Sequence, residues 1–180
     1  MDFFDAVKNR YTHKEKFLPD AVPLEALERI AEAGFAAPSG GNSQSVRLVL
    51  LPDREALQPL CDVSPAISLR TAPAAIALFT DNMTQTGELN FEIEDYSAAA
   101  ENMLLAATAL GYVSVWLDSP YFDKDKEAAA RALLNAPKSC RLRAVIPVGL
   151  PDGPGSRREK LPYEERVFYN KYYNKKNESC

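Results

Sequence analysis

The amino-acid sequence predicts an α+β fold in which a mixed, mainly antiparallel sheet is flanked by helices. About four segments are rich in branched apolar residues, as strands are, and several others carry apolar residues at helical spacing. The two kinds of segment do not alternate strictly and no GxGxxG follows a strand, which disfavours a doubly wound α/β fold. The chain has 180 residues and neither an internal repeat nor a linker, so residues 1–180 are expected to form a single domain.

The segments with helical spacing are residues 3–10, 18–38, 92–111 and 123–135. Pro23 suits the first turn of the second segment, and Pro38 ends it. The third segment is the longest. It is apolar on nearly all sides from Ala98 onward, and Gly111 ends it. Such a helix must be buried all round, which favours a symmetric partner, the alternative being the central core helix of a monomer.

The segments expected to be strands are residues 46–51, 72–80, 112–117 and 141–151. The first alternates between apolar and polar residues, whereas the second shows little alternation and is expected to be buried. Residues 53–61 begin a helix that Pro59 interrupts. Residues 152–162 form a charged loop rich in glycine and proline, and a tyrosine-rich tail with a short helix follows.

Composition excludes several classes of function. The net charge is −4 and the pI is about 5.2, which argues against nucleic acid as a partner. The sequence shows no membrane span and no signal peptide, so a cytoplasmic location is expected. The three cysteines show no CxxC spacing and His13 is the only histidine, so neither a metal site nor a Ser-His-Asp triad is expected.

Three polar clusters, residues 8–17, 34–46 and 156–162, do not resemble core. The first and third could be solvated charged surface, and the second could equally be a plain connector whose glycines supply positive φ. If the fold joins the basic clusters, Arg10, Lys14, Arg158 and Lys160 suit a phosphate. The hydroxyl and amide groups of residues 39–44 suit a heteroaromatic ring. Together the clusters predict a phosphorylated cofactor that carries a ring system.

Four segments in order resemble the nitroreductase family of flavin-dependent NAD(P)H oxidoreductases. They are NRYTHKEKF (9–17), APSGGNSQ (37–44), ENMLLAATALGYVSVWL (101–117) and IPVGLPDGPGSRREKLPYEERV (146–167). Two features depart from the family pattern. Ser45 and Val46 replace the Pro-Trp that follows the loop glutamine, and the segment 81–91 is short, which implies a small lid and a more open substrate pocket.

The resemblance implies a nitroreductase-like fold in an intertwined homodimer with one FMN in each of two interface sites. It assigns the phosphate and ribityl contacts to Arg10, Thr12, Lys14, Arg158 and Lys160, with Tyr11 at a position where the family varies. From the other subunit it assigns the ring and ribityl contacts to Pro38, Ser39 and Asn42, with Gln44 as support. It implies that the backbone amides of Leu117, Asp118 and Ser119 face the flavin N5 and O4, and Arg70 is expected to approach the pyrimidine carbonyl.

The implied activity is hydride transfer from NADH or NADPH to a nitroaromatic, a quinone or a related small-molecule acceptor by a ping-pong mechanism. The cofactor supplies the chemistry, so no catalytic side chain is assigned. Lys14 or Arg70 is expected to stabilise the anionic reduced flavin near N1 and O2. The alternatives are a flavin store, sensor or specialised flavin-consuming enzyme without NAD(P)H turnover, and a dimerisation module that has lost the cofactor. The sequence decides neither the physiological acceptor nor the choice between NADH and NADPH.

Overall fold

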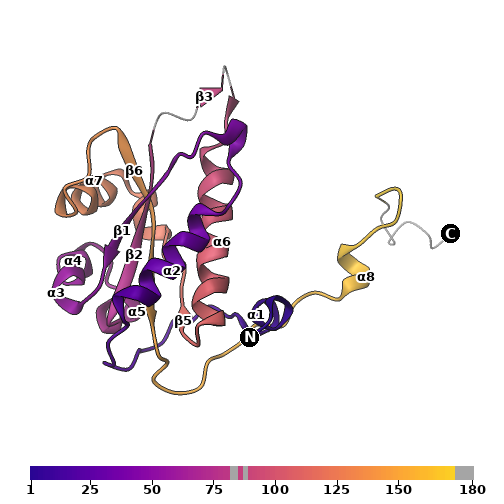
Figure 1. Cartoon of the computed structure of the whole chain (residues 1–180), viewed down its shortest axis with the longest axis horizontal. Helices are drawn as coiled ribbons and strands as arrows, with labels where there is room; N and C mark the ends of the chain where they lie inside the picture. The colour runs from indigo at the N-terminus through magenta and orange to yellow at the C-terminus, as the bar shows by residue number, and fades with distance from the viewer. Residues whose placement is uncertain (82–84, 87–88, 173–180) are drawn as a thin grey trace.

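A four-stranded antiparallel sheet lies at the centre of the molecule (Figure 1). The computed structural model describes residues 1–81, 85–86 and 89–172. The strand order is β1-β2-β6-β5, and the strands are β1 (Val46–Leu51), β2 (Ala74–Asp81), β6 (Cys140–Gly149) and β5 (Val113–Ser114). Helices lie on both faces of the sheet, so the predicted α+β class is confirmed.

Strand β2 is buried along its whole length, which explains its lack of alternation in the sequence. Ala75, Ala77 and Phe79 point into the apolar core on one face of the sheet, and Ile76 and Leu78 into the core on the other. Side chains alternate along a strand, so a central strand covered on both faces needs apolar residues on both, as β2 has from Ala74 to Phe79.

Helices α2 (Leu24–Phe35) and α6 (Glu92–Ala109) cover one face of the sheet. Leu27 and Ile30 of α2 are buried, whereas Leu24, the first residue of the helix, is 51% exposed. Gly34 allows the two helices to approach closely, since a Cβ there would lie 2.9 Å from Cγ of Met103.

Helix α6 ends as predicted, with Gly111 at φ +89° beyond its last turn. The expectation that it is buried on every side does not hold within one protomer. Ala99 and Ala107 are buried against the protomer itself, while Ala98 and Ala106 are half-buried and Ala109 is exposed. One stripe of the helix packs inside, and the opposite stripe remains accessible.

Short helices cover the other face of the sheet together with α7 (Lys124–Leu133). Pro59 separates α3 (Arg54–Leu57) from α4 (Leu60–Val63), as the sequence predicts. Three elements were not predicted, and they are α5 (Ile67–Thr71), β3 (Gln85–Thr86) and β4 (Leu89–Asn90). The predicted strand 112–117 is reduced to β5 and an isolated bridge from Leu117 to Val145, because pairing with β6 breaks in between. Residues 82–84 and 87–88 of the predicted small lid lie outside the described residues.

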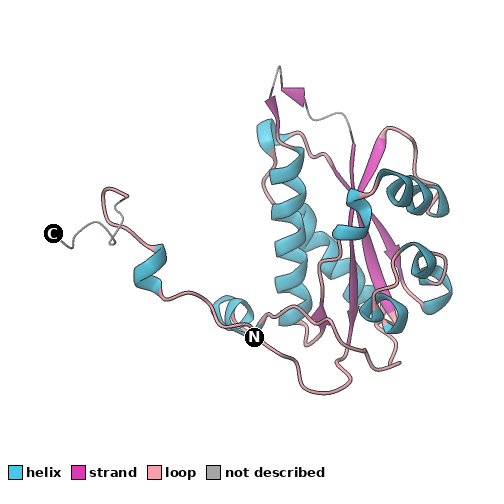
Figure 2. Ribbon diagram, turned by 180° about the vertical axis from the view of Figure 1, so that it is seen from behind, coloured by secondary structure: helices cyan, strands magenta, loops and turns pink. Residues whose placement is uncertain are grey.

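The N-terminal helix lies beside an inner stretch of the C-terminal segment, outside the sheet and the helices that cover it. Figure 2 shows α1 (Phe3–Asn9) beside the C-terminal segment, which continues outward through α8 (Tyr163–Arg166). Phe4 is 80% exposed, and Tyr163, Tyr169 and Tyr172 are exposed as well. Within the described ranges, every helix is too short or too polar to span a bilayer.

Candidate functional site

A cavity of about 670 Å³, here called the basic cavity, forms where residues 7–15 meet residues 156–160. Its lining residues are Val7, Lys8, Arg10, Tyr11, Thr12, Lys14, Glu15, Ser156, Arg157, Arg158 and Lys160. The cavity therefore brings together the six residues placed on the phosphate side of a cofactor site, which are Arg10, Tyr11, Thr12, Lys14, Arg158 and Lys160. Cationic side chains outnumber the one carboxylate, Glu15, so the cavity favours an anionic ligand.

Backbone pairing holds the N-terminal segment in place beside the C-terminal segment. The Thr12 backbone bridges to Ser114 of β5, and the His13 N–H donates to the Ser114 carbonyl at 3.0 Å. Farther along, Phe17 bridges to Pro151 at the end of β6. The residues around 10–14 thus run next to the chain that leads into 155–160.

Arg157 joins the two segments, and the sequence analysis did not assign it a role. Its guanidinium donates to the carbonyls of Lys8 at 2.9 Å and Asn9 at 2.8 Å, and it lies 5.7 Å from the ring centroid of Tyr11. These carbonyls end α1, where a cation is favoured. Gly155 allows the contact, since a Cβ there would lie 2.1 Å from the Tyr11 ring. The signal in the sequence was the Arg157–Arg158 pair, of which only one member was used.

A second cavity of about 390 Å³, here called the loop cavity, lies where α2 ends and β1 begins. It is lined by Pro38, Ser39, Asn42 and Gln44, which are the four residues assigned to the ring side of the site. The remaining lining residues are Gly34, Phe35, Ala37, Ser45, Val46, Arg47, Asp95 and Ala99.

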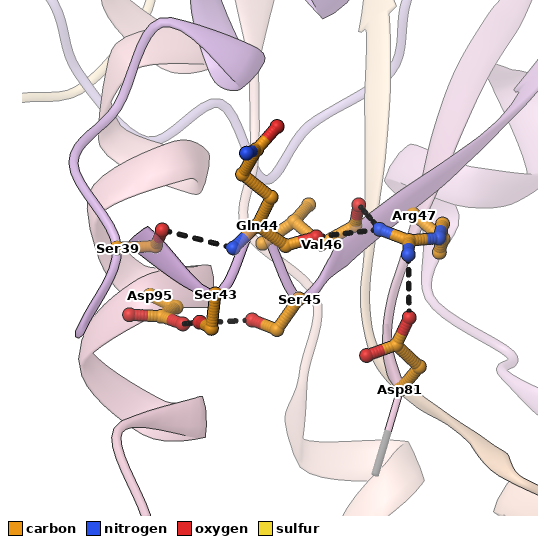
Figure 3. A network of polar contacts seen from close by, with 8 residues as sticks. All are labelled: Ser39, Ser43, Gln44, Ser45, Val46, Arg47, Asp81 and Asp95. Carbon is orange, nitrogen blue, oxygen red and sulfur yellow. Dashed lines mark hydrogen bonds and ion pairs between the residues drawn. The ribbon is translucent and has the colours of Figure 1, made fainter. Parts of the chain in front are cut away.

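The loop from Ser39 to Ser45 contains the 3₁₀ turn η1 (Gly40–Asn42) and is folded tightly. Gly41, Asn42 and Gln44 have φ of 58°, 55° and 50°. The Gln44 N–H donates to the Ser39 hydroxyl at 3.0 Å, which closes the turn. The carboxylate of Asp95 on α6 accepts from the loop as well, and the sequence analysis missed it (Figure 3). The sequence could have indicated Asp95 only as an acidic residue on the side of the helix whose other buried residues are almost all apolar.

The replacement of Pro-Trp by Ser45 and Val46 has a clear structural outcome. The Ser45 hydroxyl donates to Asp95 at 2.8 Å, and Val46 starts β1 opposite Thr80. Arg47 donates to the Gln44 carbonyl at 2.6 Å and pairs with Asp81 at 2.7 Å (Figure 3). The loop therefore enters its strand directly, and polar contacts fix the junction.

Comparison with known proteins identifies the family. A family model described as "Nitroreductase family" matches residues 7–68 and 64–150. The chain belongs to the nitroreductase family.

Individual relatives agree with this membership. A protein of Methanothermobacter thermautotrophicus, named provisionally as an NADH dehydrogenase/NAD(P)H nitroreductase, is 31% identical over 87% of this chain and 82% of its own. A protein of Bacteroides thetaiotaomicron with the same provisional name has a solved structure at a TM-score of 0.82, 27% identity and coverage of 94% and 98%. A protein of Desulfovibrio desulfuricans, named provisionally as a nitroreductase and solved in complex with FMN, has a TM-score of 0.79, 28% identity and coverage of 96% and 99%.

Residues 117–119, which follow β5 and were assigned to the flavin N5 and O4, line neither cavity. The Leu117 N–H already donates to the Val145 carbonyl at 3.0 Å, so this amide is engaged within the sheet. Asp118 and Ser119 follow in the turn that leads into η2 (Ser119–Phe122), and the Tyr121 N–H donates to the Asp118 carbonyl at 2.8 Å. Burial raises the pKa of the Tyr121 phenol well above its usual value, so this side chain is a neutral anchor for the turn.

Arg70 is not brought to either cavity. It lies exposed near the end of α5, and its assignment to the pyrimidine carbonyl stays a prediction.

The single histidine and one of the two described free cysteines are buried. No group of three or more His, Cys, Asp or Glu among the described residues is arranged to hold a metal. The ring of His13 is buried and its Nε2 donates to the Lys16 carbonyl at 2.9 Å. Burial raises the pKa of the Cys61 thiol, which disfavours the reactive thiolate.

Proposed function

We propose that this protein is an FMN-dependent oxidoreductase that moves a hydride from NADH or NADPH to a small-molecule acceptor by a ping-pong mechanism. Nitroaromatics, quinones and related compounds are the proposed acceptors. The observation that carries the proposal is the basic cavity, in which residues from both ends of a nitroreductase-family chain converge. The FMN complex of the Desulfovibrio desulfuricans nitroreductase supports the choice of cofactor.

The residues fit the phosphate and ribityl part of FMN. Arg10, Lys14, Arg158 and Lys160 supply cationic donors, and Thr12 supplies a hydroxyl. Glu101 pairs with Arg10 Nε at 3.1 Å, which orients the guanidinium while its terminal nitrogens remain for a phosphate. The cavity of about 670 Å³ lies within the range that ligand pockets of this kind occupy.

The residues of the loop cavity fit the ring. Ser39, Asn42 and Gln44 line it with hydroxyl and amide groups, which can donate to ring carbonyls or accept from ring N–H groups. Asn42 and Gln44 are exposed, so both are accessible to a ligand. The amides of Asp118 and Ser119 are proposed to approach the flavin N5 and O4.

A homodimer would join the two halves of the site. The described residues that line the basic cavity and the loop cavity do not overlap, so one protomer presents two separate half-sites. The accessible stripe of α6, with Ala98, Ala106 and Ala109, allows another helix to approach closely. Exposed Phe3 and Phe4 of α1 add an apolar surface next to the basic cavity.

Bound FMN would supply the redox chemistry, accepting a hydride from the nicotinamide and passing it to the acceptor. The chain's residues bind and orient it. Lys14 is proposed to place positive charge near the pyrimidine edge, where it stabilises the anionic reduced form. No side chain is assigned as a general acid or base.

Spectroscopy of the purified protein tests the proposal. We expect a yellow protein whose flavin absorption bleaches on anaerobic addition of NADH or NADPH and returns on addition of a quinone or nitroaromatic. Bound flavin that neither nucleotide bleaches would contradict the enzyme and favour a flavin store, sensor or flavin-consuming enzyme. A colourless protein that binds no added FMN would contradict the cofactor and favour a dimerisation module.

A further inference from the structure

A single buried carboxylate holds the loop from Ser39 to Ser45. Asp95 is only 2% exposed and lies in the first half of α6. Its Oδ1 accepts from the Gly40 N–H at 2.7 Å, and its Oδ2 accepts from the hydroxyls of Ser43 at 2.9 Å and Ser45 at 2.8 Å. Figure 3 shows both serine side chains pointing to this carboxylate, while the Gln44 side chain points away from it.

The loop backbone needs such a support. Asn42 and Gln44 are not glycines, yet both are in the left-handed region, which is unfavourable for residues with a Cβ. A conformation of this kind persists where surrounding contacts fix it. Asp95 fixes the loop before, between and after these two residues, at positions 40, 43 and 45.

The loop is also pressed against the start of α6. A Cβ at Gly40 would lie 2.2 Å from Cγ of Phe91, so only glycine fits there without moving the ring. Phe91 and Asp95 are one turn apart on the same helix end, and the two contacts together fix Gly40 in place. The exposed edge of the loop, with Asn42 and Gln44, is therefore set by Phe91 and by Asp95, which borders the loop cavity but uses both carboxylate oxygens to hold the loop.

We propose that Asp95 is the positioning residue of this loop and fixes its flavin-facing edge before the cofactor binds. The proposal rests on the proposed function, since it takes the loop as the wall that meets the flavin ring. A preset wall loses less conformational freedom on binding, so removing Asp95 weakens flavin affinity through the loop, whose donors engage both of its carboxylate oxygens. Ser43 and Ser45 are its partners, and Ser45 supplies here what a proline at that position could not.

Flavin affinity of matched variants tests the proposal. We expect Asp95→Ala to raise the FMN dissociation constant by about tenfold or more, as expected for the loss of hydrogen bonds to a charged group. Asp95→Asn keeps an oxygen for the Gly40 N–H and an amide for the hydroxyls, so it should restore most of the affinity. Glu94→Gln removes the same charge from an exposed neighbour on α6 and should leave the affinity unchanged.

Comparison of FMN with riboflavin separates the loop from the basic cavity. Asp95→Ala should weaken both ligands by the same factor because it acts on the ring side, whereas Arg158→Ala should weaken FMN alone. A folded Asp95→Ala protein that binds FMN within about twofold of the unchanged protein would overturn the proposal. Selective loss of FMN over riboflavin in Asp95→Ala would overturn it as well.

Hydrogen exchange in the flavin-free protein gives a readout that needs no cofactor. The Gly40 and Gln44 amides should exchange faster in Asp95→Ala than in Glu94→Gln, and unchanged exchange would contradict the positioning role. If the protein binds no FMN, the proposed function fails while this measurement still decides the role of Asp95. If Asp95→Ala does not fold, Ser43→Ala and Ser45→Ala replace it, and unchanged flavin affinity in both would refute the idea.

Discussion

At the scale of single residues, a half-buried ion pair ties the start of α6 to the sheet. Glu92 pairs with Arg143 of β6 and accepts from the Thr80 hydroxyl, while Arg143 Nε donates to Thr80 Oγ1 at 2.9 Å. Burial opposes ionisation of Glu92, but the hydrogen bonds from Thr80 and Arg143 outweigh it and hold its pKa below the ordinary value of 4.5. The charged carboxylate therefore stabilises the folded state.

The sign of this pKa shift predicts how stability depends on pH. Because the pKa is lower in the folded state, the contribution of Glu92 is complete above about pH 4.5 and is lost as pH falls through the lowered folded value. We expect Glu92→Gln to lower the free energy of unfolding by about 2 kcal/mol at pH 7. Denaturant unfolding across pH should show this difference shrinking toward acid pH. A difference that stays constant down to pH 3 would contradict this account, and Glu94→Gln is the control.

Lys14 and Arg70 allow a matched test of charge near the flavin. Lys14 lines the basic cavity and Arg70 lines neither cavity, although both are exposed cations. We expect Lys14→Ala to make the flavin reduction potential more negative by about 30 mV, equivalent to about 1.4 kcal/mol for a two-electron couple. Arg70→Ala should leave it unchanged. A shift in Arg70→Ala alone, measured by reductive titration against a reference dye, would reverse the assignment.

At the scale of elements, the site depends on contact between residues 8–15 and residues 156–160. Arg157 makes this contact by capping the end of α1 and stacking on Tyr11, which sets Arg158 and Lys160 next to Arg10 and Lys14. Both segments are largely exposed, and no apolar core lies between them to do the same.

Removing the contacts of Arg157 with Lys8, Asn9 and Tyr11 should therefore weaken FMN binding more than it destabilises the fold. We expect Arg157→Ala to weaken FMN binding about tenfold while the thermal unfolding midpoint changes by no more than about 2 °C. Arg157→Lys should not restore binding, because a single ammonium cannot match the fork that reaches both carbonyls. Arg166→Ala, an exposed arginine on α8, is the control. Titration of FMN by fluorescence quenching gives the affinities. If Arg157→Ala bound FMN as tightly as the unchanged protein, Arg157 would not be needed to join the two segments.

At the scale of the whole molecule, α1 and the C-terminal segment, which lie away from the sheet (Figure 2), carry several exposed apolar residues. Phe3 and Phe4 pack edge to face at 5.4 Å yet both remain exposed. An aromatic pair left in this way is typical of a surface that another chain covers.

The dimer can be tested on this surface. We expect Phe4→Asp to raise the dimer dissociation constant by at least about thirtyfold, and to reduce FMN binding with it because the two half-sites separate. Leu133→Asp, at an exposed leucine of α7 on the far face of the sheet, should change neither. Sedimentation at several protein concentrations measures the equilibrium. A Phe4→Asp protein that is monomeric but binds FMN fully would show that one protomer holds the whole site.

Much of the fold could be predicted because its signals are local. The spacing of Leu27, Ile30 and Gly34 shows a helix, and the apolar run of β2 shows a strand covered on both faces. Short elements such as α5 and β3 carry too few residues for a periodic signal, so they were missed. The site was half predictable. The cations at residues 10, 14, 158 and 160 stand out by type, whereas Asp95 and Arg157 differ from ordinary surface charges only by their contacts.

By itself, the sequence determined the α+β class, the order of the main elements and the types of chemistry available, because periodicity and side-chain type are properties of neighbours along the chain. Only the tertiary structure decided which distant residues meet. It joined residues 8–15 to 156–160, and it placed Asp95 under a loop about fifty positions away in sequence. It also showed that Leu117 uses its amide within the sheet. Such contacts depend on packing between distant segments, and the pattern of residues along one segment does not predict them.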